Sequence, residues 1–347
     1  WFAAIRYYIL NQVDLYGTMY YPLMNMFRTE SYGFLFGVFL AIPVFIILSL
    51  LYWTINKIWS KTPEENRTGR RAFFRTAATI VPLATIGGSC YAAFAGQQEV
   101  VVTHESFGYT NLPPGLKNYK IVQLSDIHIG PSIDLDDFDE ILKLALLQKP
   151  NRVVITGDLI DKLAWLPQVC ERLTTFAKQI PDGVDFILGN HEYHHDVNKV
   201  LDSLKRNTPM NILVNSNIQI MGGKQPVYIA GVAYDNDREK EKREAMIDKA
   251  LSGIPDYAFV ILLAHHPEFF EESIERKIPL TLSGHTHGGQ IVFMGMPLVP
   301  TGTPYTKGRY VEEQSVCYVN NGTGHWFPIR INCPREITVI TFFDGVA

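Results

Sequence analysis

Residues 283–290 read Ser-Gly-His-Thr-His-Gly-Gly-Gln, and they follow directly on an apolar run over residues 278–282. If that run is a buried strand, His285 and His287 lie on the loop at its carboxyl end. In an extended chain, two side chains with this spacing share one face. On a turn bordered by glycines they can instead point to two different places. Alone, the stretch is as compatible with an ordinary polar loop as with a metal site.

Four further apolar runs end in the same kinds of residue. The runs are Lys120–Leu124, Arg152–Ile155, Val184–Leu188 and Phe259–Leu263, and they lead into Ser-Asp-Ile-His, Thr-Gly-Asp, Gly-Asn-His-Glu and Ala-His-His-Pro. Segments with helical spacing alternate with them, over residues 138–147, 165–177, 198–206 and 238–251. Such alternation predicts a layered α/β domain. Because ligands gather at the carboxyl ends of strands in α/β folds, we expect one polar cluster at one edge of a sheet.

The predicted cluster is rich in metal-binding side chains. Its members are Asp126, His128, Asp158, Asn190, His191, His265, His285 and His287. They offer oxygen and nitrogen atoms without a thiolate, which suits Mn, Fe or Zn and differs from a structural zinc–thiolate site. Eight groups are too many for one ion but fit two ions that share a carboxylate. Two ions about 3.5–4 Å apart can polarise a water and clamp a phosphoryl group.

The order of these motifs resembles the signature of the calcineurin-like metallophosphoesterase superfamily. The motifs are Asp126-x-His128, Gly157-Asp158, Gly189-Asn190-His191-Glu192, a separate histidine and Gly284-His285-x-His287, within about residues 119–343. The resemblance implies a four-layer αββα sandwich with two divalent ions (Mn, Fe or Zn), which hydrolyses a phosphoester or phosphodiester by metal-bound hydroxide. The ending over residues 284–290 resembles a branch of membrane-anchored or twin-arginine-exported enzymes. That branch includes cell-wall-associated phosphoesterases and is similar to the chlamydial UDP-2,3-diacylglucosamine hydrolase.

The resemblance also implies a role for each metal-binding residue. The first ion would be held by Asp126, His128 and His287, the second by Asn190, His265 and His285, and both by a bridging Asp158. Because His266 directly follows His265, either could be the ligand, and the family pattern favours His265.

Further roles concern catalysis and substrate. By the same resemblance, His191 lies beside the leaving-group oxygen, where a departing alkoxide needs a proton or a positive neighbour. His266 and Tyr193 are predicted substrate contacts. Arg330 follows a glycine-rich loop over residues 320–326 and is either a phosphate contact or a surface residue.

The first hundred residues predict a membrane region. Between Ser31 and Asn56 there is no charged residue, and about twenty apolar residues suffice to span a bilayer as a helix. A second uncharged run, over residues 76–98, is rich in the small residues that let membrane helices pack closely. We therefore expect a membrane region over residues 1–98, with transmembrane helices at about 31–56 and 76–98 and an interfacial or partial helix over 1–27. A linker over 99–117 and a metallophosphoesterase domain over 118–347 would follow.

Charges predict the orientation of this region. The connection between the two uncharged runs carries Lys57, Lys61, Arg67, Arg70, Arg71 and Arg75 against Glu64 and Glu65. The positive-inside rule places such a connection in the cytoplasm and the following domain outside. Arg-Arg-Ala-Phe-Phe at residues 70–74 resembles a twin-arginine export signal, and an ordinary basic flank is an equal alternative. Both place the catalytic domain on the extracytoplasmic side.

Together these features predict a membrane-anchored, two-metal phosphoesterase that acts on a phosphorylated small molecule or lipid at the bilayer or envelope. One alternative is a cytoplasm-facing pyrophosphatase for a UDP-diacylglucosamine-type substrate. An alternative of another class is a non-catalytic metal-binding scaffold or sensor. The formal net charge of −4 argues against a nucleic-acid partner. The four cysteines form no C-x-x-C pattern, so we expect buried thiols, with Cys317–Cys333 as the one pair to check.

Overall fold

The structure is a computed structural model that describes residues 16–18, 20–58, 64–96, 100–234, 239–325, 327 and 329–345. The chain divides into two compact units. One consists of residues 1–98 with 328–330, and the other of residues 99–327 with 331–347.

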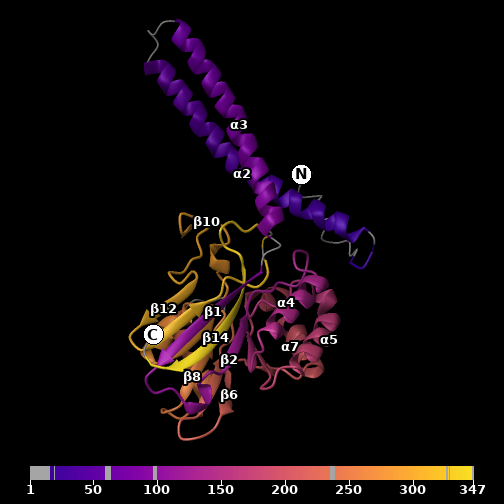
Figure 1. Ribbon diagram of the computed structural model, residues 1–347, viewed down its shortest axis with the longest axis vertical. Coiled ribbons are helices and arrows are strands. Elements are labelled where there is room, and N and C mark those ends of the chain that lie inside the picture. The colour runs from indigo at the N-terminus through magenta and orange to yellow at the C-terminus, as the bar shows by residue number, and fades with distance from the viewer. Residues whose placement is uncertain are drawn as a thin grey trace. The chain divides into compact units, whose positions relative to one another are not determined.

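The first unit contains two long helices, α2 (Tyr21–Ile58) and α3 (Glu64–Gly96), drawn in indigo and purple in Figure 1. They pack closely where glycines leave room: a Cβ on Gly33 would meet the Cα of Cys90 at 2.8 Å, and one on Gly37 would meet the Cα of Ile86 at 2.6 Å. Segments Thr29–Ile58 and Thr68–Phe94 are long and apolar enough to cross a membrane. Many of their described apolar side chains are exposed, as expected of helices surrounded by lipid.

The two helices are longer than predicted. Helix α2 begins at Tyr21, so residues 21–27 are part of it and do not form a separate interfacial helix; residues 1–15 and 19 lie outside the described part of the chain. Helix α3 already begins at Glu64, so Arg70 and Arg71 are helical. Hydropathy detects the apolar part of a helix, whereas backbone hydrogen bonding continues through charged residues that have good helix propensity.

The second unit is built on two sheets. Within the described residues, the first has the order β1 (Val100–Tyr109), β14 (Arg335–Asp344), β2 (Lys120–Leu124), β3 (Arg152–Ile155), β4 (Val184–Phe186) and β5 (Asn211–Ile212). The second has the order β12 (Gly308–Glu312), β13 (Ser315–Val319), β9 (Leu280–Ser283), β8 (Phe259–Leu263), β7 (Val227–Gly231) and β6 (Ser216–Met221).

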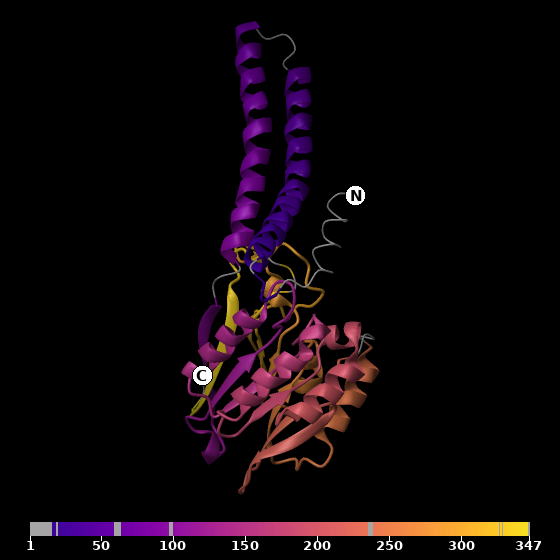
Figure 2. The same cartoon turned by 90° about the vertical axis from the view of Figure 1, so that its right-hand side faces the viewer.

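Two layers of helices cover the outer faces of the sheets. Helices α4 (Leu135–Leu147), α5 (Leu166–Ala177) and α7 (Val197–Asn207) lie along the first sheet (Figure 1), and α8 (Lys240–Leu251) and α9 (Phe269–Glu275) lie along the second (Figure 2). The connections contain α6 (Asn190–His195), the 3₁₀ turns η1 (Pro114–Leu116), η2 (Leu163–Trp165) and η3 (His287–Gly289), and a small hairpin of β10 (Val292–Phe293) and β11 (Met296–Pro297). The αββα sandwich predicted from the sequence is therefore confirmed.

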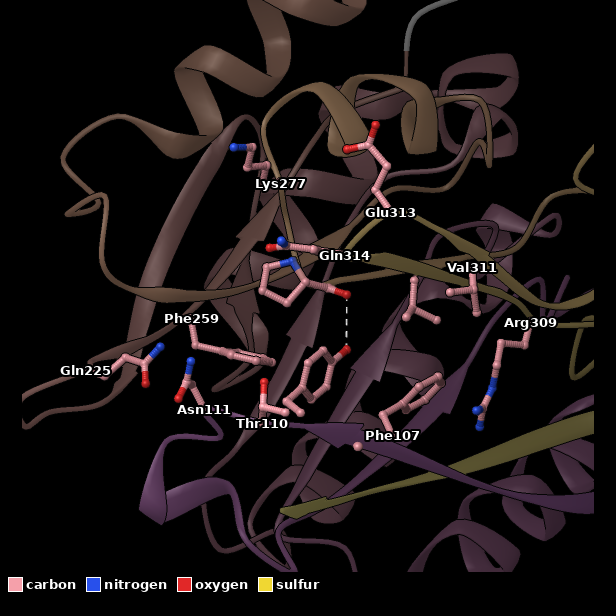
Figure 3. Close-up of a pocket in the computed structure, with 14 residues that line it drawn as sticks. Phe107, Thr110, Asn111, Gln225, Phe259, Lys277, Arg309, Val311, Glu313 and Gln314 are labelled. Atoms are coloured by element: carbon pink, nitrogen blue, oxygen red, sulfur yellow. Dashed lines mark hydrogen bonds between the residues drawn. The ribbon is translucent and has the colours of Figure 1, made fainter. Parts of the chain in front are cut away.

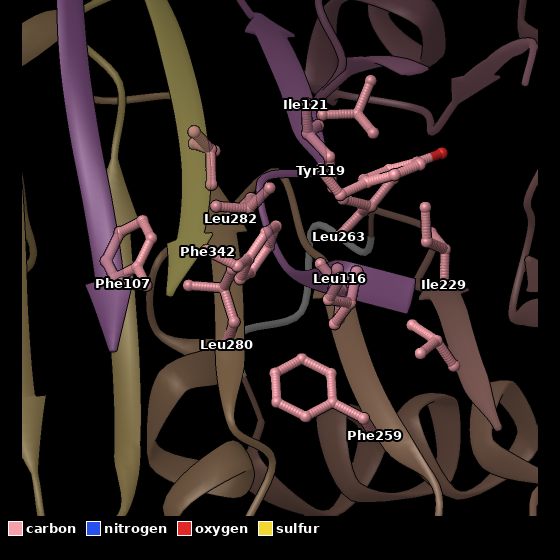
Figure 4. Packing of buried hydrophobic residues seen from close by; sticks show 14 of the residues in the cluster. Phe107, Leu116, Tyr119, Ile121, Ile229, Phe259, Leu263, Leu280, Leu282 and Phe342 are labelled. Carbon is pink, nitrogen blue, oxygen red and sulfur yellow. The ribbon is translucent and has the colours of Figure 1, made fainter. Parts of the chain in front are cut away.

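The core lies between the sheets. Ile121 and Phe342 of the first sheet pack with Ile229, Leu263 and Leu280 of the second, and all five side chains are buried (Figure 4). The central strands are apolar on both faces because helices cover their outer sides. Burying a large aliphatic side chain contributes about 1.5–3 kcal/mol, so this double layer holds the strand ends firmly in place.

One prediction for this unit is wrong. Residues 99–117 were expected to be a linker, but they contain β1 and η1. Strand β1 pairs in parallel with β14 from Val100 opposite Arg335 to Tyr109 opposite Asp344. The apolar run at residues 100–102 is too short to be recognised alone, and its partner lies near the other end of the chain.

Candidate metal centre

The predicted ligands lie at the carboxyl ends of parallel strands. Asp126 and His128 follow β2, Asp158 follows β3, His265 follows β8, and His285 follows β9. Gln123 of the first sheet donates from Nε2 to the carbonyl of Ser283 in the second, at 2.9 Å, so the two edges are joined directly. The structure thus brings the ligands together at one edge of the sandwich, as expected.

Five of these residues have an unusual backbone. Asp126, His128, Asp158, His285 and His287 have φ values of 51°, 53°, 52°, 70° and 50°. The left-handed region is costly for residues other than glycine and is concentrated at functional sites. Backbone hydrogen bonds from Asp126 N to Gly157 O and from His128 N to Asp158 O, both 3.0 Å, hold the turns in place. The chain accepts this strain where a strand end must turn its side chain back toward the edge.

The first ligand group consists of Asp126, His128 and His287, all buried. The Nε2 atoms of the two histidines are 3.1 Å apart, and Nε2 of His287 is 3.4 Å from Oδ1 of Asp126. Nδ1 of His128 is 3.2 Å from a carboxylate oxygen of Asp161, which leaves Nε2 with its lone pair facing the group. Lone pairs that converge in this way fit a cation, so the donors suit a metal ion.

The second ligand group consists of Asn190, His265 and His285. Oδ1 of Asn190 is 3.0 Å from Nε2 of His265 and 2.9 Å from Nδ1 of His285, and these two nitrogens are 3.3 Å apart. Nδ1 of His265 donates to the carbonyl oxygen of Thr156 at 2.8 Å. Because a carbonyl only accepts, this bond fixes the tautomer and leaves Nε2 available to an ion. The group includes His265 and not His266.

Asp158 faces both groups with one oxygen. Its Oδ2 lies 3.6 Å from Nε2 of His128 and 3.3 Å from Nε2 of His265. Its Oδ1 accepts a hydrogen bond of 2.8 Å from the backbone nitrogen of His191. One oxygen of this carboxylate is thus held by the backbone, and the other lies between the two groups. This is the position that a bridging ligand needs.

The electrostatics of the cluster favour cations. Burial lowers the pKa of His265, but the carboxylates of Asp158 and Asp126 outweigh burial and raise this pKa to about 10. Burial likewise lowers the pKa of His128, but the carboxylates of Asp161, Asp158 and Asp126 together outweigh burial and raise this pKa to about 9. The negative potential that holds these protons also attracts divalent ions, which compete for the same lone pairs.

Two carboxylates that sequence reasoning missed position the site. Oδ1 of Asp161 is 2.7 Å from Nδ1 of His191 and 3.2 Å from Nδ1 of His128. The buried carboxylate of Glu192 accepts from the backbone nitrogens of Asp158, Leu159 and Gly189 at 3.0, 2.7 and 2.7 Å. Asp161 follows Asp158 by three residues, and Glu192 completes the Gly-Asn-His-Glu motif, so local signals for both were present.

The predicted catalytic residue His191 lies next to the first group, on α6. Its ring centre is 4.4 Å from that of His128, and its side chain is a quarter exposed. With Nδ1 against Asp161, its Nε2 is the nitrogen that can exchange a proton with another molecule.

The predicted substrate contacts are placed in different ways. His266 stacks on His285 with ring centres 3.7 Å apart, Tyr234 lies 5.0 Å from His266, and Tyr193 lies 5.7 Å from Tyr234. These rings form a row from the second ligand group to the partly exposed Tyr193, and Tyr234 is its unpredicted member. Arg330 is buried and belongs to the unit of residues 1–98 and 328–330, so its contact with substrate stays a prediction.

A pocket of about 530 Å³ lies elsewhere, at the opposite ends of the strands (Figure 3). Phe107 and Phe259 line it, and the hydroxyl of Tyr109 donates to the carbonyl of Pro279 at 3.0 Å. Phe259 begins the strand whose other end leads to His265, so this pocket is separate from the metal centre.

Gly284 allows the two sheets to approach each other at the metal centre. A Cβ on this residue would overlap Oγ of Ser125 and Oδ2 of Asp126. We expect Gly284→Ala to displace Asp126 and to weaken metal binding by at least about tenfold, the scale of a disturbed ligand environment. Metal content after dialysis measures this. Gly222→Ala is the matched control, because the nearest atom to its Cβ would be 3.6 Å away; equal metal content in both variants would contradict the argument.

Known proteins resemble this chain along most of its length. Residues 119–289 match the calcineurin-like phosphoesterase family. An uncharacterized metallophosphoesterase of Campylobacter jejuni is 31% identical over 348 residues, which cover 98% of this chain and 86% of the relative. One of Bacillus subtilis is 31% identical over 272 residues, 74% of this chain and 90% of the relative.

A third relative, from Danio rerio, is described as a transmembrane protein with a metallophosphoesterase domain. It is 27% identical over 318 residues, which cover 88% of this chain and 71% of the relative. The matches to the two bacterial relatives cover nearly the whole length of each relative. The chain therefore belongs to the calcineurin-like metallophosphoesterases, a family of metal-dependent phosphoric ester hydrolases that use a dinuclear divalent metal centre.

Proposed function

We propose that this protein is a membrane-anchored phosphoesterase that hydrolyses a phosphoester or phosphodiester of a membrane- or envelope-linked substrate. The observation that carries the proposal is the position of Asp158, whose Oδ2 lies 3.6 Å from one ligand group and 3.3 Å from the other. A shared carboxylate between two groups of donors is the arrangement that two divalent ions need. The two apolar helices support the anchor.

Each ligand would have a distinct task. Asp126, His128 and His287 would hold one ion, Asn190, His265 and His285 the other, and Asp158 both. When bound, the ions supply an activated water and compensate the charge of the phosphoryl oxygens. The oxygen and nitrogen donors suit Mn, Fe or Zn.

His191 would handle the leaving group. Asp161 holds the Nδ1 proton of this histidine at 2.7 Å and so orients the ring. The Nε2 atom would then donate a proton to the departing oxygen, or stabilise its charge as an imidazolium. His266, Tyr234 and Tyr193 would contact the remainder of the substrate, since their rings extend outward from His285.

The finer identity of the substrate depends on the side of the membrane. The basic residues before the second apolar segment favour a cytoplasmic connection and an extracytoplasmic catalytic domain. A cell-wall polymer or lipid-linked phosphate would be accessible there, as in the exported branch that the sequence resembles. A UDP-diacylglucosamine-type pyrophosphatase would instead face the cytoplasm. Reporter fusions after residue 347 distinguish the two, and a cytoplasmic signal would overturn the extracytoplasmic assignment.

Hydrolysis of bis-p-nitrophenyl phosphate tests the reaction. The full chain, purified in detergent, should release p-nitrophenol with Mn²⁺, lose this activity with a chelator and regain it when Mn²⁺ is restored. The exposed Asp256→Asn variant should behave like the unaltered chain. If the protein binds two ions per chain yet hydrolyses neither this diester nor p-nitrophenyl phosphate, the scaffold function is favoured instead.

A further inference from the structure

An exposed apolar hairpin lies next to the metal centre. Strands β10 and β11 pair with Phe293 opposite Met296, and Met294 and Gly295 at the tip have φ values of 49° and 83°. Positive φ at both central residues defines a tight two-residue turn that projects its side chains outward. Five apolar side chains within seven positions are exposed: Phe293 (59%), Met294 (82%), Met296 (66%), Leu298 (59%) and Val299 (43%).

The base of the hairpin is held by backbone hydrogen bonds and follows the candidate ligand loop directly in the chain. Val292 donates its backbone N–H to Ile331 O at 2.9 Å, and Leu298 donates its backbone N–H to Ile291 O at 2.8 Å. The hairpin begins shortly after His287, and Sγ of Cys333 contacts the carbonyl oxygen of His287 at 3.3 Å. The apolar tip therefore extends from the same edge of the sandwich as the candidate metal ligands, and its base is held by backbone hydrogen bonds.

Strand β1, which follows the apolar helices in the chain, begins at this same edge. Val100 pairs with Arg335 at the start of β14, and β14 runs antiparallel to β2, with Thr338 opposite Gln123. The first residue of β1 thus lies at the carboxyl end of β2, where Asp126 follows. Helix α3, which includes the apolar segment Thr68–Phe94, ends only three residues before β1 begins.

We propose that residues 292–299 form a membrane-contacting hairpin whose tip enters the interfacial region of the bilayer and directs the metal centre toward phosphate groups of amphiphilic molecules in that bilayer. The stretch Ile-Val-Phe-Met-Gly-Met-Pro-Leu-Val-Pro at residues 291–300 contains no charged or hydrogen-bonding side chain. A docking surface for a soluble protein carries a polar rim, whereas a purely apolar tip in a chain that also contains two helices long and apolar enough to cross a membrane matches the boundary of the acyl chains. This inference rests on the proposed phosphoesterase function and specifies its substrate class.

Fluorescence quenching tests the contact directly. Met294→Cys is labelled with an environment-sensitive fluorophore in the full chain, reconstituted in phosphatidylcholine–phosphatidylglycerol vesicles that contain acyl-chain spin-labelled lipid. The control is Val311→Cys, because Val311 is 62% exposed but pairs with Val316, near the opposite ends of the strands. Both variants carry Cys90→Ser, since the other three cysteines are buried. Quenching of the fluorophore at position 294 should exceed quenching at position 311 several-fold. Equal quenching at the two positions overturns the proposal. So does a loss of quenching at position 294 when the protein density in the vesicles rises, because it indicates that this position contacts a second copy of the chain.

A kinetic comparison tests the consequence for substrate. The triple variant Phe293→Ser/Met294→Ser/Met296→Ser should hydrolyse soluble bis-p-nitrophenyl phosphate at the original rate. Its hydrolysis of a long-chain alkyl p-nitrophenyl phosphodiester embedded in vesicles should fall about tenfold, since interfacial binding scales with buried apolar area. Val311→Ser should change neither rate. An equal effect on both substrates contradicts the proposal, while a chain that shows quenching but no hydrolysis of either substrate contradicts only the phosphoesterase function.

Discussion

Asp158→Asn is expected to reduce the bound metal from two ions to one or none per chain and to lower the turnover of bis-p-nitrophenyl phosphate by at least about 10²–10³-fold, the scale for loss of a central electrostatic group. Asn retains the size of the side chain but removes the charge of the one carboxylate that faces both ligand groups. Elemental analysis and steady-state kinetics on the same preparations measure both effects.

Asp126→Asn provides the comparison for this experiment. Asp126 belongs to the first ligand group only, so its substitution should affect one ion and leave the second in place. Burial raises the pKa of Asp158, but His265 and His128 outweigh burial and hold it well below the usual range, so the carboxylate is ionised at neutral pH. Two tightly held ions in the Asp158→Asn variant would rule out a bridging role.

His191→Ala is expected to keep both ions but to slow turnover by about 10²–10⁴-fold for a substrate with a poor leaving group, the usual contribution of a general acid. The effect should shrink for p-nitrophenol, which departs as a stable anion and needs no proton. A series of phenyl phosphodiesters with increasing leaving-group pKa therefore measures the role directly. A loss that is uniform across the series would assign His191 to binding.

Asp161→Asn should reproduce part of this loss and add a second effect. The carboxylate contacts both His191 and His128, so its removal should also weaken the first ion about 10–100-fold, as expected for a partner of a ligating histidine. Burial raises the pKa of Asp161, but the three histidines around it, His128, His191 and His195, outweigh burial and hold it well below its usual range. If added Mn²⁺ restores the metal content of this variant but not its turnover, the turnover that is still missing is due to the lost contact with His191.

The cluster of candidate ligands could be predicted from sequence because its signals are local. An apolar run that stops at an Asp or a His marks both the strand and its carboxyl end, and all seven predicted metal ligands lie in the two groups or between them. The family pattern favoured His265 over His266, and in the structure Nε2 of His265 lies 3.0 Å from Oδ1 of Asn190 whereas the ring of His266 stacks on His285.

The remaining features depend on contacts between distant residues. Strand β1 has its partner β14 more than two hundred residues away, so nothing near Val100 signals the pairing. Asp161 lies near His128 because its backbone nitrogen donates to the carbonyl oxygen of Ile129 at 2.9 Å, a contact between the loops that follow β3 and β2. All four cysteines are free thiols and the pair Cys317–Cys333 forms no disulfide; Cys170, Cys317 and Cys333 are buried as expected, whereas Cys90 is only half-buried.

The pairing of β1 with β14 has a consequence for biosynthesis. Ser106 and Thr341, which hydrogen-bond across these strands, are separated by 235 positions in the chain. At 5–20 residues per second, a ribosome needs roughly 10–50 s to add that length. During this time β1 and β2 lack the strand that belongs between them, while the helices before them have already left the ribosome. The part of the sheet beside Asp126 is therefore completed only after residues 335–344 have left the ribosome, and a protein truncated before residue 335 should be degraded and not accumulate as a smaller enzyme.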